Sequence, residues 1–495
     1  MKKLYDVCFT DKTDRKELYY KSSVNINILN NNSVILSKNT VIDLITYFNS
    51  FSLYKWKKYT TIENVIICGA VYGNAEIEII GLSNQQNNII KREIISEKFK
   101  FEFKLSDLQY EIIGIKITAL EDNCKIYNIS YNGDFENYQN KNIGIVICTF
   151  NRQRYVTKLI EKFKIFQKNH QWLSVIVVDN GRNLTQYNDE NFKLLYNPNY
   201  GGSGGFTRGM MEYVTENKVE YILLMDDDID IDITTLERTH SLVCGIKDKY
   251  IESFLSGAML IMDNPTIQKE NMAYWNKIRL HSLGCGLDLS KTDNLLINEQ
   301  QKIYINQYPA WWFCVIPLER IKVIGYPLPI FIKGDDIEYG IRNDRPIINM
   351  NGIAVWHEDF RSKANDVINY FSDRNMLMIN QYAKGCNRTT LFVAIIGRLY
   401  KHLLDRNYRG IKYLDLAVSD FADGLYKLVQ VPSDEKFIMV HKYNLNYSSI
   451  KAIVNIVFKA ILCLFTYKNI KNNYLNFRTE KLQTQMFWNE FLKKR

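Results

Sequence analysis

The sequence lacks the features that mark secreted, disulfide-linked and membrane-spanning proteins. Its nine cysteines are scattered and form no C-x-x-C pair, which predicts reduced thiols rather than a disulfide framework or a cysteine-based metal site. The first twenty residues contain no apolar core, so we expect no secretory signal peptide. We also expect no membrane-spanning helix, because no apolar run reaches the length that a bilayer requires.

The composition is that of a folded protein with more than one domain. At 495 residues, with 46% hydrophobic and 24% charged residues, the chain is too long for one simple core, and two or three domains are expected. Only eight prolines occur. The net charge of +9 is modest for this length, and we expect no nucleic-acid partner.

The first 140 residues are predicted to form a β-sandwich or jelly roll, and none of them has a catalytic pattern. Short segments rich in β-branched and aromatic residues are separated by Asn, Gly, Asp and Ser, which is typical of such folds. The segments are AEIEIIGL (75–82), FKFEFKL (99–105), IIGIKITAL (112–120) and KIYNISY (125–131).

Strands and helices alternate in the next segment, 141–375. NIGIVICTF is a continuous apolar run, as expected for a strand buried on both faces. A helical stretch (153–168) and the runs LSVIVVDNG, FKLLYN and EYILLMDDD follow it. This order predicts an α/β domain with a mostly parallel sheet and a nucleotide-sized crevice at the carboxyl ends of its strands.

The remainder, 376–495, is predicted to be helical and basic. Residues 451–495 carry nine Lys/Arg and two Glu. Within the apolar stretch 450–471, Asn455 and Lys459 interrupt the run, a pattern that suits a helix lying on an anionic membrane surface. A terminal helix packed on the core, with a solvated basic face, explains it equally well.

The run YILLMDDDIDID (221–232) ends an apolar strand in adjacent carboxylates, which are costly to bury unless a cation offsets their charge. Carboxylate oxygens are the ligands that Mg²⁺ and Mn²⁺ prefer, and such a metal usually bridges protein and substrate phosphates. In strand geometry Asp226 and Asp228 share one side and Asp227 faces the other. We expect Asp230 and Asp232 to be ordinary solvated acids.

Two other interpretations of this run are open. Asp226, Asp228, Asp230 and Glu237 match the spacing of an EF-hand loop, but Ile231 replaces the glycine at its turn. The run could also be a solvated acidic turn without function.

Three further stretches contain candidate site residues. NPNYGGSGGFTRG (197–209) is a flexible turn or a phosphate-binding loop ahead of a helix, and it matches neither the dinucleotide-binding fingerprint nor the P-loop. One acid of FIKGDDIEYG (331–340) is a candidate general base, although capping of the following helix also explains an acid there. His357 ends the apolar run AVWH, and Trp311 and Trp312 offer either sugar-stacking faces or core packing.

Together these motifs resemble the bacterial UDP-galactofuranosyltransferases, which are inverting family 2 glycosyltransferases. Eight motifs occur in the order of that family over about residues 143–375. They are CTFNR, VVDNG, GGSGGF, MDDD, WWFC, FIKGDDIEYG, AVWH and YF-x-x-RN. The resemblance implies a GT-A core, a Rossmann-like mixed sheet, between an N-terminal β-sandwich and a helical, membrane-associating C-terminal part.

The resemblance also implies roles for individual residues. The metal, Mn²⁺ or Mg²⁺, would be held by Asp226, Asp228 and His357, and Asp336 would be the catalytic base. Trp311, Trp312 and Asp335 would lie on the acceptor side. The donor would be held by Thr149, Phe150, Arg152, Asp179, Asn197, Gly201, Gly202 and Asp227.

Two positions depart from the family pattern. Gly334 stands where the mycobacterial enzymes have Trp, and Ser372 stands where they have His. Both lie on the sugar-binding side, so they bear on the acceptor and the donor sugar rather than on the metal or the base.

The sequence therefore predicts a metal-dependent inverting transfer of a sugar, galactofuranose by resemblance, from a UDP donor to a hydroxyl of a glycan or lipid-linked glycan. We expect a cytoplasmic protein, peripheral on the inner face of the cell membrane, with oligomerisation open. The alternatives are a sugar nucleotidyltransferase, for which the CTFNRQR loop has few basic residues, and a non-catalytic carbohydrate-binding protein.

Overall fold

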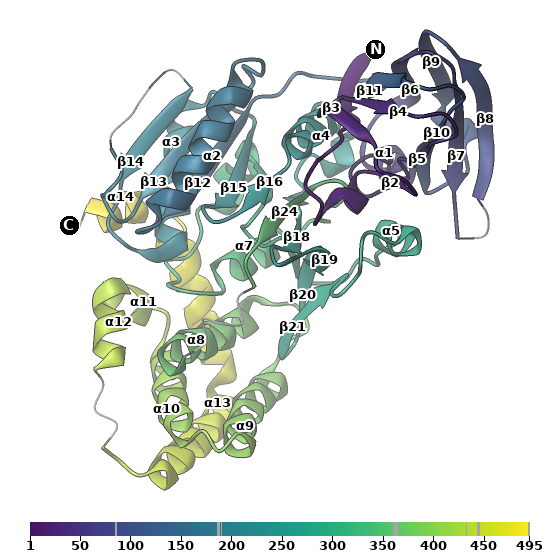
Figure 1. Cartoon of the computed structure of the whole chain (residues 1–495). Helices are drawn as coiled ribbons and strands as arrows, with labels where there is room; N and C mark the ends of the chain where they lie inside the picture. The colour runs from purple at the N-terminus through teal and green to yellow at the C-terminus, as the bar shows by residue number, and fades with distance from the viewer. Residues whose placement is uncertain are drawn as a thin grey trace.

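A computed structural model describes residues 1–84, 87–185, 189, 191–359, 365–431, 433–442 and 446–493. Figure 1 shows the N-terminal strands on one side of a central sheet with helices, and the C-terminal helices below both. The last strand of the N-terminal sheets ends at Phe135, and the first central strand begins at Ile143. The three-domain division at residues 140 and 375 stays a prediction.

The N-terminal part is a sandwich of two antiparallel sheets, as predicted. Alternate residues of its strands, such as Ile77 and Ile79, are fully buried between the sheets. All four predicted segments are strands, and the sheets contain further strands that the sequence did not single out, the long β6 among them. One sheet contains β1 (Lys2–Asp6), β3 (Asn27–Asn30), β4 (Ser33–Leu36), β6 (Ile62–Tyr72), β9 (Lys98–Lys104) and β11 (Cys124–Phe135); the other contains β2 (Lys21–Ser22), β5 (Val41–Asp43), β7 (Ala75–Leu82), β8 (Asn87–Ile95) and β10 (Ile112–Ala119), and α1 (Leu53–Tyr59) follows β5.

The central sheet has the strand order β14-β13-β12-β15-β23-β17. The first four strands are parallel, and β23 runs antiparallel between β15 and β17, so this is the predicted Rossmann-like mixed sheet. Its strands are β12 (Ile143–Thr149), β13 (Leu173–Asp179), β14 (Phe192–Tyr196), β15 (Tyr221–Asp226), β17 (Leu255–Ser256) and β23 (Cys314–Pro317); the associated helices are α2 (Gln153–Gln167), α3 (Gly201–Glu216), α4 (Ile233–Cys244) and α6 (Leu318–Ile324).

Two small sheets adjoin the central one. The first has the order β16-β24-β18-β19 and the second β21-β20-β22. Their elements, with the two nearby helices, are β16 (Asp230–Ile231), β18 (Ala258–Ile261), β19 (Asn264–Glu270), β20 (Met272–Asn276), β21 (Arg279–Leu283), α5 (Thr292–Glu299), β22 (Gln307–Tyr308), α7 (Asp335–Asn343) and β24 (Ala354–His357).

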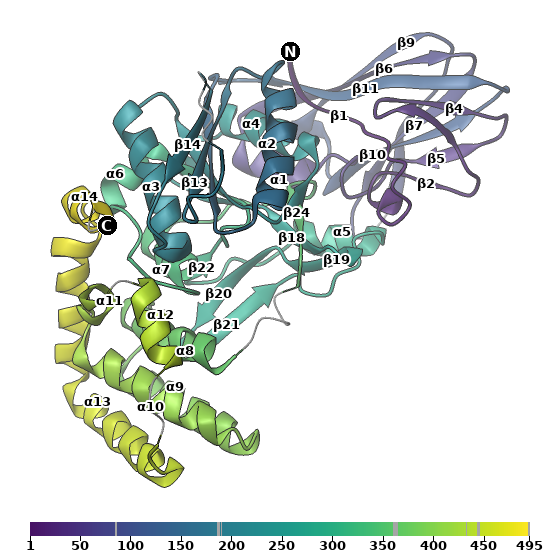
Figure 2. The same ribbon diagram turned by 60° about the vertical axis from the view of Figure 1, so that its left-hand side comes forward.

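The C-terminal part is helical, as predicted. Figure 2 shows the long α13 running along the other helices and returning the chain to α14, which lies near α3. Tyr200 and Phe491 pack with their ring centroids 4.5 Å apart there. The helices are α8 (Asp366–Tyr382), α9 (Arg388–Leu404), α10 (Tyr408–Asp423), α11 (Lys427–Gln430), α12 (Ser433–His441), α13 (Ser449–Phe477), a π-helical turn (Arg478–Leu482) and α14 (Gln485–Lys493).

The expectation that no apolar helix reaches membrane-spanning length was wrong. By length and composition alone, the helix over Ser449–Leu482 is long and apolar enough to cross a membrane. Asn455 and Lys459 lie within this continuous helix, and both reach Asp415 on α10, at 3.3 and 3.4 Å. Only 22% of the most apolar 18-residue stretch of this helix is buried.

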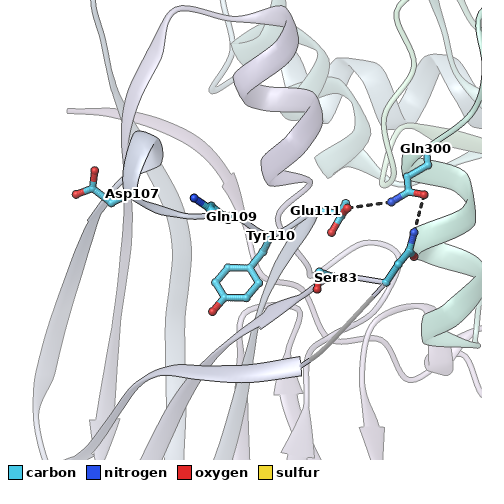
Figure 3. Close-up of a pocket in the computed structure, with 7 residues that line it drawn as sticks. Ser83, Asp107, Gln109, Tyr110, Glu111 and Gln300 are labelled. Carbon is cyan, nitrogen blue, oxygen red and sulfur yellow. Dashed lines mark hydrogen bonds between the residues drawn. The ribbon is translucent and has the colours of Figure 1, made fainter.

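Polar contacts join the sandwich to the rest of the chain. Figure 3 shows a cavity at this junction in which Gln300, just after α5, donates to Glu111 at 2.9 Å. The side chain of Asn84 donates to Gln300 at 2.7 Å. None of the predicted site residues lines this cavity.

Asp230 and Asp232 are not the ordinary solvated acids that the sequence predicted. Asp230 accepts from Arg15 of the sandwich at 2.8 Å and from Lys162 of α2 at 3.2 Å, and these cations lower its pKa to about 2 against the effect of burial. Asp232 caps α4 by accepting from the backbone of Thr234. Both acids therefore hold elements together.

The glycine-rich stretch is not a loop ahead of a helix, because α3 begins at Gly201. A Cβ at Gly205 would lie 2.2 Å from Cys148 Sγ, and one at Gly209 would lie 2.3 Å from Val146 Cγ1. The glycines therefore let the first turns of α3 lie directly on β12.

Candidate active site

The carboxyl ends of three parallel strands meet at one edge of the central sheet. Thr149 of β12 is level with Asp179 of β13, and Cys148 is level with Asp226 of β15. Ligands of such sheets bind outside this edge. The predicted clustering of polar side chains after these strands is therefore present.

Asp226, Asp228 and His357 come together although the last two are 129 positions apart in the sequence. Each offers a ligand atom, and these atoms lie within 4.8 Å of one another. His357 Nε2 lies 2.9 Å from Asp228 Oδ1 and 3.5 Å from Asp226 Oδ2. The cause is the short strand β16, which follows the acidic turn and pairs antiparallel with β24, the strand that ends at His357.

The donor set fits a divalent cation. His357 Nδ1 lies 2.7 Å from the carbonyl oxygen of Glu358, a contact that holds the proton on Nδ1 and turns Nε2 toward the carboxylates. Burial alone would lower the pKa of His357, but the carboxylates of Asp226 and Asp228 raise it to about 10. The carboxylates of Asp226 and Asp228 therefore favour positive charge at this point, and a bound metal ion would take the place of the proton on His357 Nε2.

Asp227 is not part of this cluster. It is buried, and its Oδ2 accepts from Thr149 at 2.6 Å. Arg152 donates to Asp227 at 3.2 Å and also contacts Asp228 closely. Burial, opposed by Thr149 and Arg152, raises the pKa of Asp227 to about 6. Asp227 and Asp228 thus hold the guanidinium of Arg152 at the site.

The EF-hand interpretation is excluded. Within the stretch that would form the loop, residues 230–231 form β16 and α4 begins at Ile233. Glu237 lies on α4 with His170 at 3.4 Å.

Two adjoining cavities form a cleft along this edge. One, of about 540 Å³, contains predicted donor residues, and the other, of about 640 Å³, contains the predicted base and acceptor residues. They share Gly201, Gly202, Phe206, Asp226 and Ile332. We call them the donor cavity and the acceptor cavity.

Most predicted donor residues line the donor cavity, but two lie behind its wall. Thr149, Phe150 and Arg152 line it, together with Gly201, Gly202 and Asp227. Asp179 is fully buried and accepts backbone N–H groups of Gly181, Asn183 and Leu184 at 2.7–2.8 Å. Asn197 is buried and donates to Asn180 at 3.0 Å. Asn180 itself lines the cavity.

The predicted acceptor residues line the acceptor cavity. Trp311 packs edge-on against Phe206 of α3, and the indole of Trp312 donates to the carbonyl oxygen of Gly257 at 2.9 Å. Asp335 and Asp336, the first residues of α7, lie on the same wall. The N-cap of α7 is Gly334, so neither acid is the cap that the sequence allowed.

Asp335 and Asp336 differ in their surroundings. Desolvation raises the pKa of Asp335 to about 7, against the backbone N–H groups of Asp335, Asp336 and Ser203, which stabilise its charge. Desolvation, and next the charge of Asp335, raise the pKa of Asp336 well above the usual range. A carboxylate that is a strong proton acceptor is suited to general-base work.

The two departures from the family pattern both line the acceptor cavity. Gly334 has φ of 102°, and a Cβ there would lie 3.2 Å from Ile379 Cδ1, so this backbone disfavours any larger residue. Ser372 lies on α8, which borders the same cavity.

Sequence reasoning missed several lining residues. Asn180 had a signal, since it follows Asp179 at a strand end. Trp275 and Tyr308 of the three-stranded sheet, and Met376 and Arg398 of the C-terminal helices, had none. In the donor cavity Phe331 had a signal, as the first residue of the FIKGDDIEYG motif, whereas Phe437 and Ile438 had none because they lie more than 200 residues after the acidic turn.

Comparison with known families agrees with this geometry. Residues 9–126 match the family described as Galactofuranosyltransferase 2 N-terminal. Residues 144–244 match Glycosyl transferase family 2. The predicted resemblance is therefore confirmed for both parts of the chain, and the second match favours glycosyl transfer over nucleotidyl transfer.

Two curated relatives are similar over most of the chain. Galactofuranosyltransferase GlfT2 of Mycolicibacterium smegmatis is 23% identical over 439 residues, which cover 81% of this chain and 66% of the relative. GlfT2 of Mycobacterium tuberculosis is 23% identical over 452 residues, covering 79% and 67%. The chain thus spans about two thirds of the length of these relatives.

Among solved structures, Staphylococcus aureus TarS has a TM-score of 0.37 at 11% identity, covering 65% of this chain and 55% of TarS. The mannosyltransferase PcManGT of Pyrobaculum calidifontis, in complex with GDP-Man and Mn²⁺, has a TM-score of 0.31 at 10% identity, covering 66% and 88%.

Proposed function

We propose that this chain, a glycosyltransferase of family 2 related to the GlfT2 galactofuranosyltransferases, transfers galactofuranose from a UDP donor to a hydroxyl of a glycan or lipid-linked glycan. The observation that supports this most directly is the cleft itself. Asp226 of the cation-favouring cluster lines both the donor cavity, which contains the predicted donor residues, and the acceptor cavity, which contains the tryptophan pair and Asp336.

The reaction assigns a separate task to each part of the cleft. Asp336 accepts the proton of the acceptor hydroxyl while that oxygen attacks the anomeric carbon of the donor sugar. The bond from this carbon to the β-phosphate oxygen breaks, its electron pair leaves with UDP, and the configuration inverts. Trp311 and Trp312 present apolar faces to the acceptor sugar, and Asp335 orients it.

Asp336→Asn tests the base. The amide keeps the shape of the side chain but accepts no proton, so transfer should fall by about 10²–10⁴-fold while UDP still binds. The measurements are single-turnover transfer and UDP titration of the same preparation. Transfer at the normal rate by Asp336→Asn would remove Asp336 from this role.

Asp226, Asp228 and His357 would hold the metal, Mn²⁺ or Mg²⁺. When bound, the ion supplies positive charge to the diphosphate leaving group. The protein itself contributes Arg152, which Asp227 and Asp228 hold in the donor cavity.

Asp228→Ala tests the metal site. Removing this ligand should abolish the part of UDP affinity that depends on Mn²⁺, which calorimetry with and without the ion measures directly. Asp232→Ala is the matched control, since Asp232 caps α4 outside the cluster. Equal gains in UDP affinity from Mn²⁺ in Asp228→Ala and in the unmodified protein would contradict the assignment.

The donor sugar is tested by UDP release from a panel of UDP-sugars. Preference for UDP-galactofuranose supports the proposal. Preference for a pyranose donor would reject galactofuranose and leave the reaction type intact.

A further inference from the structure

Helix α12 of the C-terminal part reaches into the donor cavity. In Figures 1 and 2 it lies at the end of the helical part nearest the central sheet. Its side chains Phe437 and Ile438 line the cavity together with Thr149, Phe150 and Arg152. The cavity wall thus joins residues that are almost 300 positions apart in the sequence.

A polar anchor fixes α12 in this place. Lys436 pairs with Asp420 of α10 at 2.8 Å, and both side chains are at least four-fifths buried. The hydroxyl of Tyr370 on α8 also donates to Asp420, and the ammonium of Lys436 lies 5.7 Å from the centre of the Tyr370 ring. A paired charge in a buried setting fixes position strongly, because separating the pair leaves an uncompensated charge.

An apolar contact aligns Phe437 with the cavity wall. Its ring stacks on Phe371 of α8 at 6.1 Å and meets Phe331 edge-on at 6.3 Å. Phe331 in turn covers the start of α3, since a Cβ at Gly201 would lie 2.8 Å from its ring. Phe437 therefore continues an aromatic wall from the first turn of α3, where a phosphate is favoured.

Comparing Ile438 with Met439 shows that an exposed side chain on α12 does not line the donor cavity merely because it is exposed. Their exposed fractions are similar, 51% and 54%. Only Ile438 lines the donor cavity. Val440, the next residue, is 1% exposed and packs inward. The exposed apolar side chain of Ile438 is thus directed by the helix toward the cavity.

The division of the cleft indicates which part of the donor α12 contacts. Phe437 and Ile438 line the donor cavity, which contains the predicted nucleotide residues. Neither lines the acceptor cavity, which contains Asp336 and the tryptophan pair. We propose that Phe437 and Ile438 are donor-binding residues that contact the nucleoside diphosphate part of the donor, not the transferred sugar. This inference rests on the proposed function.

The test is UDP affinity, measured by calorimetry in the presence of MnCl₂. Ile438→Ala should weaken UDP about threefold to tenfold, the effect of losing one partly buried apolar contact. Phe437→Ala should weaken it by about tenfold or more. Met439→Ala should leave the affinity unchanged.

Kinetics with varied donor concentration distinguish a direct contact with the donor from a contribution of the side chain to folding stability. Both variants should raise the donor KM as much as they weaken UDP, with kcat at saturating donor and the acceptor KM unchanged. Since Ile438 is half exposed, its truncation should not lower the Tm, so a loss of affinity in Ile438→Ala reports a contact.

Three results would overturn the inference. They are equal UDP affinity in both variants and the unmodified protein, weaker binding of the UDP-sugar but not of UDP, or an equal loss in Met439→Ala. Failure of the proposed function is distinguishable, because the unmodified protein itself would then not bind UDP with Mn²⁺.

Discussion

Asp335 and Asp336 show how neighbouring residues of one type acquire different properties. Asp335 has three backbone N–H groups near its carboxylate. Asp336 accepts one, from Ile337 at 2.8 Å, and faces the charge of Asp335. The sequence could indicate only that one acid of the pair carries chemistry, because desolvation and helix N-termini are properties of the folded site.

A pH dependence follows from this pair. Because desolvation raises the pKa of Asp336 well above 3.8, Asp336 is protonated, and unable to act as a base, over a range where ordinary carboxylates are charged. The transfer rate at saturating donor should therefore fall as pH drops. A profile of transfer rate against pH measures this decrease, which forms the acidic limb of the profile. The apparent pKa belongs to the coupled pair.

Asp335→Asn tests the electrostatic origin of the limb. Removing the neighbouring charge should lower the pKa of Asp336, so the acidic limb should move to lower pH even where the maximal rate also changes. An acidic limb at the same pH in Asp335→Asn would show that Asp335 does not set it.

At the scale of elements, the contact between α3 and β12 determines the shape of the site. The sequence predicted a flexible turn or a phosphate-binding loop from the glycines, whereas they form the first turns of α3 and let it lie close to a strand. The sequence did not predict that this strand is β12, because a glycine pattern does not identify the partner. The position of His357 likewise depends on the pairing of β16 with β24, and a two-residue strand is too short to predict.

Gly205→Ala tests the packing of α3. The added methyl would lie 2.2 Å from Cys148 Sγ, so α3 must shift, and urea unfolding should show a loss of about 1–3 kcal/mol. Adding Cys148→Ala should recover part of the loss. Gly397→Ala on α9 is the control, since nothing lies within 4 Å of its added Cβ; it should gain about 0.5–1 kcal/mol. Similar effects of both alanines would contradict this account.

At the scale of the whole molecule, α13 presents an apolar stripe to solvent. Ile450, Val454, Phe458 and Phe465 are between 60% and 83% exposed and recur at helical spacing on one side. Basic residues Lys451, Lys468 and Lys471 lie on the same helix. We propose that this face binds an anionic membrane surface peripherally.

Phe458→Ser with Phe465→Ser should weaken binding of the full chain to phosphatidylglycerol vesicles by about tenfold or more, since each buried aromatic contributes on the order of 1.5–3 kcal/mol. Vesicle sedimentation measures the effect. Val323→Ser, at an equally exposed position on α6, should have none. Unchanged sedimentation of the double variant would remove α13 from membrane binding.

The sequence by itself determined the local chemistry: apolar strands ending in acids, the glycines of α3, and the helical, basic C-terminal part. These follow from periodicity and residue type within a short window. Tertiary structure decided which of these residues share a site. Asp230 and Asp232, expected to be solvated, hold α2, α4 and the sandwich in place, because ion-pair partners come from distant segments. Asp179 and Asn197 support the cavity wall from behind, whereas α12 supplies Phe437 and Ile438 to its surface, because long-range packing alone brings the C-terminal helices to the edge of the sheet.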